Sequence, residues 1–543
     1  METVSAELNP GYANRWRSLF FICISLLVVS LDNTILNVAI PSISRDLGAT
    51  GSELQWIIDS YILVFAALLL TLGALGDRFG RKRALQVGLV LFGIGSFAAG
   101  ISHTTEMLIA TRAFLGLAGA LILPSTLSIV TATFPREERA QAIAIWAAVF
   151  GLGVGLGPLI GGWLIEQFGS WNAVFFVNLP VVVVAVIGDL LFVAESKDPS
   201  APRIDVPGVV LSIIGLFALV YGIIEAGVVG WTEPNVLLAF AIAAVFLGAF
   251  GLWESRYPHA MLPMAFFRNM SFTGANLALV LVTFSLFGSV FFLSQYLQSV
   301  KGFTALEAGV RILPQALALT FMTSQSARIS ARLGTKYTVA LGILISAAGL
   351  FYLSQVLEID TPYSLIVIGQ VLLTSGLGIA ISPATNSVMG SVPVQKAGIG
   401  SAMNDTTRQL GGALGIAVLG TILNSVYLRG VAPLVTDVRA ALENVPTPVV
   451  TPEIREQIFT GIERSIQGAV AVAGRISAAN PALADRILQE SRMAFVDGMH
   501  TAMLIGAIIM IGAALLTLAI LPAQVQRPAL NPIEATPSPT SGD

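Results

Sequence analysis

Five charged side chains lie within apolar stretches that are long enough to cross a membrane: Asp32, Asp59, Arg112, Asp405 and Arg408. A charge at such a place costs at least ~2.5 kcal/mol on insertion scales, so it usually faces a cavity or a partner of opposite sign. A carboxylate there can exchange a proton or pair with a cation, and an arginine can hold a nearby carboxylate ionised. These five residues are therefore the first candidates for function.

The depths of Asp32 and Arg112 predict that their side chains can meet. At about 1.5 Å per helical residue, Asp32 lies roughly 20 Å from one face, and Arg112 and Asp59 lie roughly 8–10 Å below the other. All three then have a similar depth in a core ~30 Å thick. If the two helices adjoin, Arg112 holds a carboxylate ionised until a proton or ligand breaks the pair, or the two form a permanent structural ion pair.

Asp59 stands among aromatic residues in Leu54-Gln-Trp-Ile-Ile-Asp-Ser-Tyr61. A carboxylate beside Trp56 and Tyr61 suits a lipophilic cation, through charge pairing and cation–π contact. An ordinary aspartate at the membrane rim, flanked by interfacial aromatics, would show the same pattern.

Asp405 and Arg408 are three residues apart, so they share one face of a helix. One interpretation is a carboxylate that titrates as its surroundings change. The other is an intrahelical pair that only neutralises itself.

The composition predicts a polytopic membrane protein, because 55% of the residues are hydrophobic and 11% are charged, against about 25% charged in soluble domains. Cys23 is the single cysteine and the three histidines are scattered, which excludes an intrachain disulfide and favours no metal site.

Apolar runs of about twenty residues, one helical span each, number fourteen: 18–41, 54–76, 84–101, 106–132, 140–165, 172–194, 207–225, 235–253, 272–297, 309–331, 337–356, 363–390, 398–428 and 497–521.

Lysines and arginines gather in the loops on one side of these spans, which predicts that both termini, 1–17 and 522–543, are cytoplasmic. The tail 522–543 is rich in Pro, Ser and Thr, and we expect it to be disordered.

Residues 429–496 carry many charges at helix-like spacing and contain no spanning run. We expect them to form a small helical insertion on the outer side, since long segments are translocated largely regardless of charge.

The segment Gly73–Leu85 places five charges and three glycines between two apolar runs. Asp77 can accept hydrogen bonds, and Gly80 permits a sharp turn before the next helix. A basic loop that fixes topology would explain the arginines. It does not explain the spacing of the glycines and the aspartate.

A second glycine cluster spans Gly151–Gly162. It superficially resembles a Gly-x-Gly-x-x-Gly loop, but no strand precedes it, which argues against dinucleotide binding. Glycines four apart, Gly151 with Gly155 and Gly157 with Gly161, let helices touch backbone to backbone, and Pro158 frees a helix hydrogen bond. The pattern predicts a bending, closely packed helix.

Both clusters resemble motifs of the major facilitator superfamily. Gly73–Leu85 is similar to the superfamily's loop between its second and third helices, with Gly76 in place of a small alanine, and Gly151–Gly162 is similar to the fifth-helix antiporter motif, which marks exporters more than importers. Ser330–Lys336 is a worn copy of the first motif. Further stretches resemble the fourteen-helix drug:proton antiporter branch of the EmrB/QacA type: Leu31–Pro41, Arg112–Gly119, Phe176–Pro180 and Gly411–Ala417.

The resemblance implies an all-α polytopic membrane protein with the major facilitator fold. It implies a first six-helix bundle over 18–194, two inserted helices with their linkers over 195–271, and a second six-helix bundle over 272–521 that contains the insertion 429–496. It assigns proton coupling to Asp32, Arg112 and Asp405, and substrate binding to Asp59, Trp56, Tyr61 and Asp32. It assigns conformational gating to Gly73, Asp77, Arg78, Gly80, Arg81, Gly157, Pro158 and Gly161.

We predict a proton-coupled antiporter of the bacterial inner membrane, not an enzyme, that exports lipophilic, cationic compounds such as quaternary ammonium compounds, dyes and antibiotics by alternating access. The proton gradient supplies the energy, about 2.3 kcal/mol per charge at 100 mV, and we expect no cofactor. The expected partners are drug-like substrates, protons and membrane lipid, not nucleic acid; a periplasmic adaptor is a further candidate.

Two alternatives stay open. The same scaffold could export an endogenous lipid or metabolite. A membrane sensor would need an output domain, for which the predicted short tails leave no room. The resemblance implies no dication transport, because some dication exporters of this branch carry a carboxylate in the tenth helix, whereas Val310–Thr323 here offers only Arg311 and Gln315.

Overall fold

The computed structural model describes residues 12–197, 205–257, 264–392, 397–443 and 452–523. Within these ranges the chain is helical, and fourteen helices are long and apolar enough to cross a membrane. The prediction of an all-α polytopic protein with fourteen spans is confirmed. The predicted tail 522–543 lies outside the described residues except for residues 522 and 523.

The helices form an amino-terminal half, an inserted pair and a carboxy-terminal half. The amino-terminal half contains η1 (Tyr12–Asn14), α2 (Arg15–Leu47), α3 (Gly51–Phe79), α4 (Arg81–Gly100), α5 (Thr105–Thr133), α6 (Arg136–Phe168), α7 (Ala173–Phe176) and α8 (Asn178–Phe192). The inserted pair is α9 (Val206–Val229) and α10 (Pro234–Arg256). The carboxy-terminal half contains η2 (Met264–Arg268), α11 (Met270–Gln295), η3 (Tyr296–Val300), α12 (Ala305–Leu333), α13 (Thr335–Val356), α14 (Tyr363–Gly390), α15 (Ala397–Glu443), α16 (Pro452–Arg464), α17 (Ile466–Ile476) and α18 (Pro481–Ile520).

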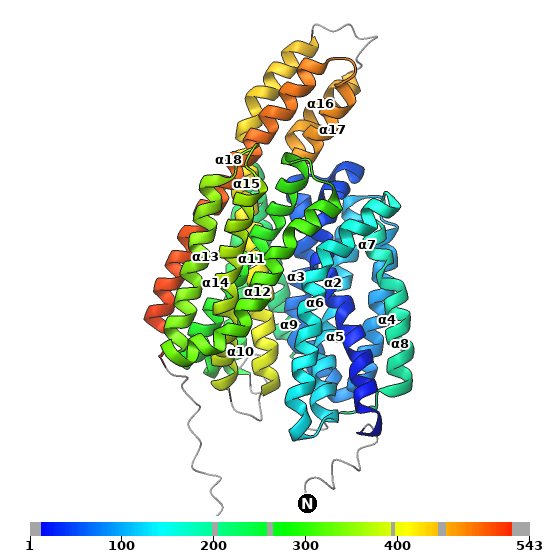
Figure 1. The fold of residues 1–543 in the computed structure, drawn as a ribbon, viewed down its shortest axis with the longest axis vertical. Coiled ribbons are helices and arrows are strands. Elements are labelled where there is room, and N and C mark those ends of the chain that lie inside the picture. Colours follow the sequence, from blue (N-terminus) through cyan, green and yellow to red (C-terminus); the bar gives the residue numbers. More distant parts are fainter. Residues whose placement is uncertain (1–11, 198–204, 258–263, 393–396, 444–451, 524–543) are drawn as a thin grey trace, which may run out of the picture.

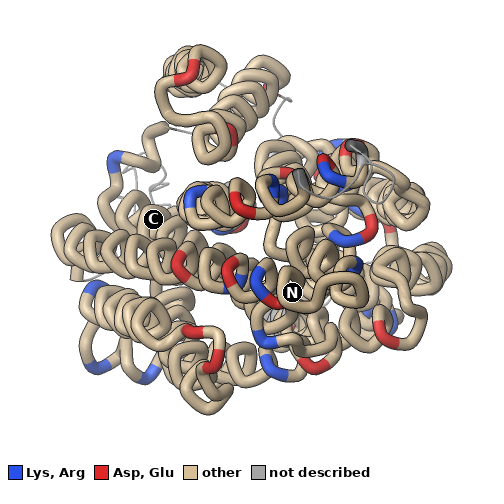
Figure 2. The backbone as a smooth tube through the Cα atoms, turned by 90° about the horizontal axis from the view of Figure 1, so that it is seen from above, with Lys and Arg blue, Asp and Glu red and all other residues tan. Residues whose placement is uncertain are grey.

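The two halves lie side by side, and the inserted pair packs at one seam between them (Figure 1). The halves meet where α3 packs on α15 and where α6 packs on α12. Helix α9 contacts both α3 and α15, and α10 packs on α9. Lys, Arg, Asp and Glu occupy only short stretches of the helical backbone (Figure 2), as expected for helices surrounded by apolar material.

The described residues of the insertion predicted over 429–496 are helical apart from short turns. Helix α15 continues without a break to Glu443, and α18 begins at Pro481, so its flanks are continuous with the neighbouring helices. Helices α16 and α17 pack beside these extensions and project from one end of the molecule (Figure 1). We call this end the hairpin end, and the opposite end, where α2 begins and α18 ends, the terminal end.

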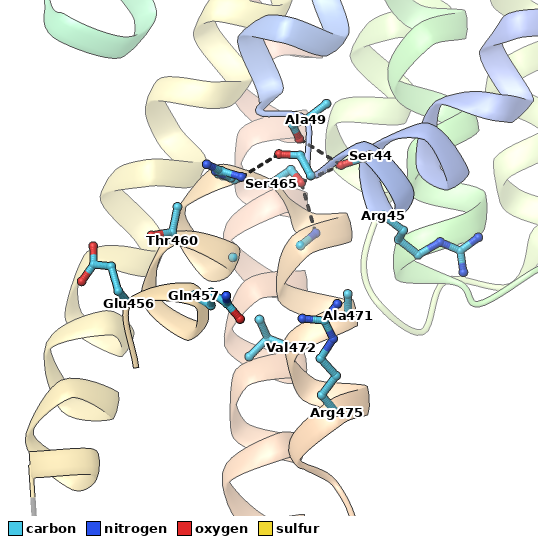
Figure 3. Close-up of a pocket in the computed structure, with 14 residues that line it drawn as sticks. Ser44, Arg45, Ala49, Glu456, Gln457, Thr460, Ser465, Ala471, Val472 and Arg475 are labelled. Carbon is cyan, nitrogen blue, oxygen red and sulfur yellow. Dashed lines mark hydrogen bonds between the residues drawn. The ribbon is translucent and has the colours of Figure 1, made fainter. Parts of the chain in front are cut away.

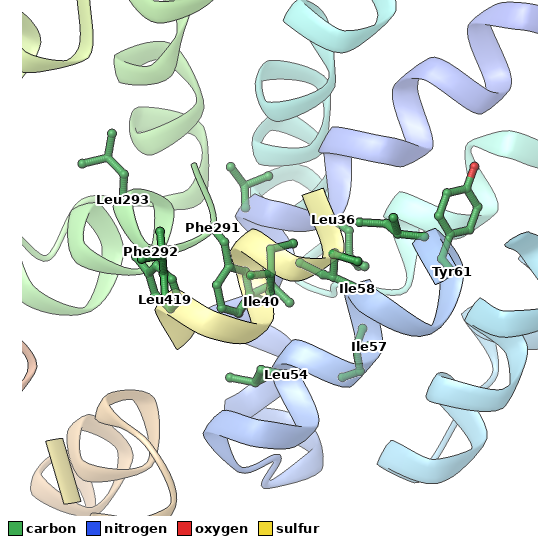
Figure 4. Packing of buried hydrophobic residues seen from close by; sticks show 14 of the residues in the cluster. Leu36, Ile40, Leu54, Ile57, Ile58, Tyr61, Phe291, Phe292, Leu293 and Leu419 are labelled. Carbon is green, nitrogen blue, oxygen red and sulfur yellow. The ribbon is translucent and has the colours of Figure 1, made fainter. Parts of the chain in front are cut away.

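A buried apolar cluster closes the hairpin end between the halves (Figure 4). It includes Leu36 and Ile40 of α2, Ile58 of α3, Phe291 of α11 and Leu419 of α15, each at most 5% exposed. Leu36, Ile40, Ile58 and Phe291 lie toward the hairpin end of their helices, and Leu419 lies near the middle of the long helix α15. Apolar burial of about 25 cal/mol per Å² then favours contact of the halves at this end.

Candidate functional site

Asp32 and Arg112 form a buried ion pair inside the amino-terminal half. Arg112 Nη1 donates to Asp32 Oδ2 at 2.6 Å, and the two side chains are 2% and 1% exposed. Arg112 Nε also donates to the carbonyl oxygen of Ile57 at 3.1 Å, and its guanidinium lies 4.3 Å from the centre of the Tyr61 ring. Helices α2, α3 and α5 are thus joined through one arginine, as the predicted depths allow.

Asn178 and Ser96 extend this polar cluster, and the sequence reasoning missed both. Asn178 Nδ2 lies 3.2 Å from Ser96 Oγ and 3.5 Å from Asp32 Oδ1, at the limit of a hydrogen bond. Both side chains are buried. Asn178 belongs to the Phe176–Pro180 stretch that carried part of the family resemblance, so a search for polar residues within apolar runs would have found it.

Asp59 is fully buried, and neither of its carboxylate oxygens has a hydrogen-bond partner among the described residues. Its position on α3 identifies its surroundings. Gln55, one turn earlier, packs against Gly420 of α15: a Cβ added to this glycine would lie only 2.5 Å from the Gln55 amide nitrogen. Residues four apart share a helix face, so Asp59 lies at the seam between the halves.

The aromatic residues predicted to surround Asp59 point elsewhere. Trp56 stacks on Phe217 of α9, with ring centres 6.0 Å apart and planes at 10°. One face of the Tyr61 ring is covered by Arg112. The structure therefore does not bring Trp56, Asp59 and Tyr61 together around one ligand, and their substrate-binding role stays a prediction.

Asp405 is partly exposed on α15, in the carboxy-terminal half. Its nearest polar contact is the amide of Asn404, at 3.4 Å from Oδ1. No ion pair joins Asp405 to Arg408 within the part of the chain that the structure describes, although the two share a helix face. Both interpretations, the titrating carboxylate and the intrahelical pair, stay predictions.

A further buried carboxylate, Asp189 of α8, was also missed. It is 0% exposed, and its Oδ2 accepts a hydrogen bond from Ser25 Oγ at 3.0 Å. Asp189 is an acidic residue within the apolar run 172–194, so the criterion that selected Asp32 and Asp59 applied equally to it.

The turn predicted at Gly73–Leu85 connects α3 to α4 at the terminal end. Gly80 has a φ of +127°, a conformation open mainly to glycine. Asp77 accepts a hydrogen bond from Arg81 Nε at 2.6 Å. Glu195, after α8, accepts from the Lys82 backbone N–H at 3.1 Å and lies 3.6 Å from Arg83 Nε. The turn is thus tied to the end of the sixth span, a contact that the sequence did not reveal.

The glycines of α6 pack against both halves. A Cβ on Gly161 would lie 2.9 Å from the carbonyl oxygen of Ile35 in α2, and a Cβ on Gly162 would lie 2.5 Å from that of Ala305. Gly309 of α12 approaches the carbonyl of Pro158 just as closely. The predicted close packing is confirmed at Gly157, Gly161 and Gly162, but not at Gly151, which has no atom within 4 Å of its Cβ position. The role of α6 in gating stays a prediction.

No group of three or more His, Cys, Asp or Glu side chains that could hold a metal ion is present among the described residues. The polar groups of the site are instead single carboxylates spread over α2, α3, α8 and α15. Such groups can bind protons or organic cations.

The two helical halves, with isolated charges within the membrane spans, define a polytopic transporter. A family model described as Major Facilitator Superfamily matches residues 22–416. The chain belongs to the major facilitator superfamily, and it is a transporter rather than an enzyme.

Relatives similar over most of their length are resistance and efflux proteins. The chain is 33% identical to the tetracenomycin C resistance and export protein of Streptomyces glaucescens, covering 92% of this chain and 90% of that protein. It is 34% identical to the multidrug efflux pump LfrA of Mycolicibacterium smegmatis, over 94% and 97%. It is 34% identical to the methyl viologen resistance protein SmvA of Salmonella typhimurium, over 76% and 83%.

Solved structures show the same fold. A bacterial homolog of the human lysosomal transporter Spinster, inward-facing and occupied, aligns with a TM-score of 0.62 at 16% identity, covering 92% of this chain and 96% of that one. The inward open xylose transporter XylE of E. coli aligns with a TM-score of 0.51 at 14% identity, over 75% and 90%.

Proposed function

We propose that this protein exports lipophilic, cationic drugs across the bacterial inner membrane in exchange for protons. The names of the relatives support drug export, since they are resistance and efflux proteins matched over most of the chain. The free energy for export comes from protons that move inward down their gradient, about 2.3 kcal/mol per charge for each 100 mV of membrane potential.

The observation that carries the proposal is Asp59, a buried carboxylate at the seam between the halves without a partner among the described residues. An unpaired charge in such a place is costly. The group is therefore compatible with burial when it carries a proton or when a cation lies beside it. A carboxylate that takes one or the other exchanges them, which is the elementary requirement of an antiporter.

Asp32 and Asp405 differ from Asp59 in their surroundings and take the proton-coupling roles. Asp32 has a permanent counter-ion, since an arginine guanidinium is not deprotonated in proteins. Protonation of Asp32 would release Arg112 from one of its contacts and loosen α2 from α5. Asp405 is partly exposed and has no ion-pair partner within the described chain, so it can meet protons directly.

We place the hairpin end on the outer side and both termini in the cytoplasm. The basic residues of the short loops support this orientation. A cysteine at Gly474, which is exposed on α17 with no atom within 4 Å of its Cβ position, should react with a membrane-impermeant maleimide from outside. Protection of that cysteine in intact spheroplasts would reverse the orientation.

The test is ethidium efflux from purified protein in liposomes under an imposed proton gradient. Asp405→Asn should abolish gradient-driven efflux. Asp59→Asn should abolish efflux of ethidium and retain efflux of a neutral drug. Asp46→Asn, at an exposed position of α2 at the hairpin end, is the matched control and should transport normally.

The absence of gradient-driven flux for every cation tested would contradict the proposal. Competition by lipid extracts for binding would then favour the exporter of an endogenous lipid or metabolite.

A further inference from the structure

The turn between α16 and α17 is hydrogen-bonded to the opposite half of the molecule (Figure 3). Ser465 Oγ lies 3.0 Å from Ser44 Oγ of α2, and Arg464 Nη1 donates to the carbonyl oxygen of Gly48 at 3.0 Å. Ser44 and Ser465 are 2% and 6% exposed. Since α16 and α17 are connected to α15 and α18, these bonds join the carboxy-terminal half to the amino-terminal half.

The direction of these hydrogen bonds follows from their neighbours. Ser44 Oγ donates its single proton to the carbonyl oxygen of Ala49 at 3.1 Å, so Ser465 must be the donor to Ser44. Ser465 Oγ in turn accepts from the Gly468 backbone N–H at 3.1 Å and caps α17. The result is one continuous chain from Gly468 through two hydroxyls to Ala49. Such chains strengthen cooperatively and lose that strength when one member is removed.

The hairpin is fixed to its own half by buried contacts. Tyr427 of α15 donates its hydroxyl proton to the carbonyl oxygen of Ile462 at 2.8 Å. Gln467 Nε2 donates to Gln295 Oε1 of α11 at 3.0 Å, and both amides are buried. Helices α16 and α17 must therefore move with the carboxy-terminal half as one body.

The contact with α2 is small by comparison. A cavity of about 500 Å³ lies beside it, lined by residues that include Arg45, Gln457 and Val472. Helix α17 also contacts α2, and the hydrogen bonds that hold the hairpin there come from the turn at Arg464 and Ser465. Two further bonds join the halves deeper at the same end: Ser294 Oγ donates to the Asn37 carbonyl at 2.7 Å, and Gln298 Nε2 to the Val38 carbonyl at 3.1 Å.

We propose that the α16–α17 turn is a latch that holds the hairpin end closed and must detach from α2 each time this end opens. The inference rests on the alternating opening of the proposed transport function. The latch adds a specific element to it: the serine chain is made only while the end is closed, and its loss shifts the population toward the open form.

A cross-link across the latch tests this. In a Cys23→Ser background, Ser44→Cys is combined with Ser465→Cys and oxidised to a disulfide. The oxidised protein should lose export and regain it on reduction. The matched control combines Gly430→Cys with Ala494→Cys, which face each other between α15 and α18 within one half: a Cβ on Gly430 would lie 2.7 Å from the Cβ of Ala494, and a disulfide requires such close Cβ atoms. That disulfide should leave export unchanged.

Two results would overturn the latch. One is undiminished export by a test pair shown by mass spectrometry to be fully cross-linked. The other is failure of the test pair to cross-link under conditions that oxidise the control pair, since the turn would then not contact α2.

A distance measurement separates the latch from the transport function. Spin labels at Asp46→Cys and Gly474→Cys, both exposed, report on the separation of α2 and α17. Ser44→Ala and Ser465→Ala should each increase the fraction of molecules with a long distance between the two labels, compared with the labelled protein in which both serines are intact. An unchanged distribution in both variants contradicts the latch. A shifted distribution in a protein without gradient-driven drug transport would retain the latch and reject the proposed function.

Discussion

The two halves of the molecule share backbone devices and differ in their charges. Helices α3 and α12, the second helix of each half, both contain 29 residues. Each begins with a capping box, Thr50 with Glu53 and Thr304 with Glu307, and each ends at a glycine of positive φ, Gly80 at +127° and Gly334 at +81°.

The charges around these shared devices are concentrated in the amino-terminal half. The turn at Gly80 is tied by Asp77, Arg81 and Glu195, while the worn copy at Gly334 is held by backbone bonds to Ser330 and Thr338. Likewise Asp32 is paired with Arg112, while Asp405 has no ion-pair partner among the described residues. Glycine is needed to form the turn in either half. Arg332 and Lys336 flank Gly334 as well, so the difference is that acidic side chains tie the turn at Gly80.

The largest expected effect comes from removing Arg112. Arg112→Leu leaves Asp32 buried without its counter-ion, and breaking a buried pair from one side costs about 3–5 kcal/mol. The thermal midpoint of the detergent-solubilised protein should fall accordingly. The double variant Arg112→Leu with Asp32→Asn should recover part of the loss, because no isolated charge is left. Asp405→Asn should leave the thermal midpoint nearly unchanged. If Asp405→Asn lowered the midpoint as much as Arg112→Leu, the difference between a paired charge in one half and an unpaired charge in the other would be contradicted.

The next effect concerns the contact between the halves. Gly309→Ala places a methyl group against the backbone of Pro158 in α6, and overpacking of this kind costs about 1–3 kcal/mol. Gly151→Ala, with no atom within 4 Å of its Cβ position, is the control and should be neutral or stabilising, since alanine favours helix by about 1 kcal/mol. The comparison is made on thermal midpoints and on efflux rates. Equal behaviour of the two variants would show that α6 and α12 do not touch.

The two glycine turns provide a smaller, matched pair. Both Gly80→Ala and Gly334→Ala force a side chain into a positive-φ conformation, which costs roughly 1–2 kcal/mol. At Gly80 the new Cβ would also lie 2.8 Å from the Glu195 carboxylate, whereas at Gly334 the nearest atom, the carbonyl oxygen of Ala523, is 3.4 Å away. Gly80→Ala should therefore lower the thermal midpoint more. Glu195→Ala combined with Gly80→Ala should remove that difference.

The smallest effect is a pH dependence at the terminal end. Arg15 donates to both carboxylate oxygens of Glu138, at 2.7 and 3.0 Å, and this hydrogen bonding lowers the pKa of Glu138 below its usual value. A lowered pKa means that the bond stabilises the fold at neutral pH and that this contribution is lost as the pH falls through the titration of the carboxyl group. The difference in thermal midpoint between the native protein and Glu138→Gln should be small at pH 7 and vanish in acid. A difference that grows in acid would contradict the assignment.

The sequence predicted correctly those features that depend on a single helix or turn. The length and apolarity of each run specify a span, because a helix satisfies its own backbone within lipid. Gly80 specifies a turn, and the glycines of 157–162 specify close packing. The predicted insertion 429–496 is helical, apart from short turns, where the structure describes it, and the sequence did not reveal that its flanks continue the neighbouring helices: α15 runs past Pro433 to Glu443.

The candidate site required information that no single helix carries. The pairing of Asp32 with Arg112 was within reach, because their depths could be counted along each helix. The direction of a side chain around the axis depends on the neighbouring helices. The sequence therefore grouped Trp56, Asp59 and Tyr61, while packing separates them among α9, α15 and α5.

The sequence by itself determined the class of protein, the number of spans, the glycine turns and the presence of charges in the membrane, since all of these depend on residues close together along the chain. The tertiary structure alone decided which charges have partners. It paired Asp32 with Arg112, left Asp59 at the seam between the halves, brought Glu195 to Gly80 and docked Ser465 on Ser44. Each of these contacts joins residues that are distant in sequence, and the packing of helices fixes which of them can meet.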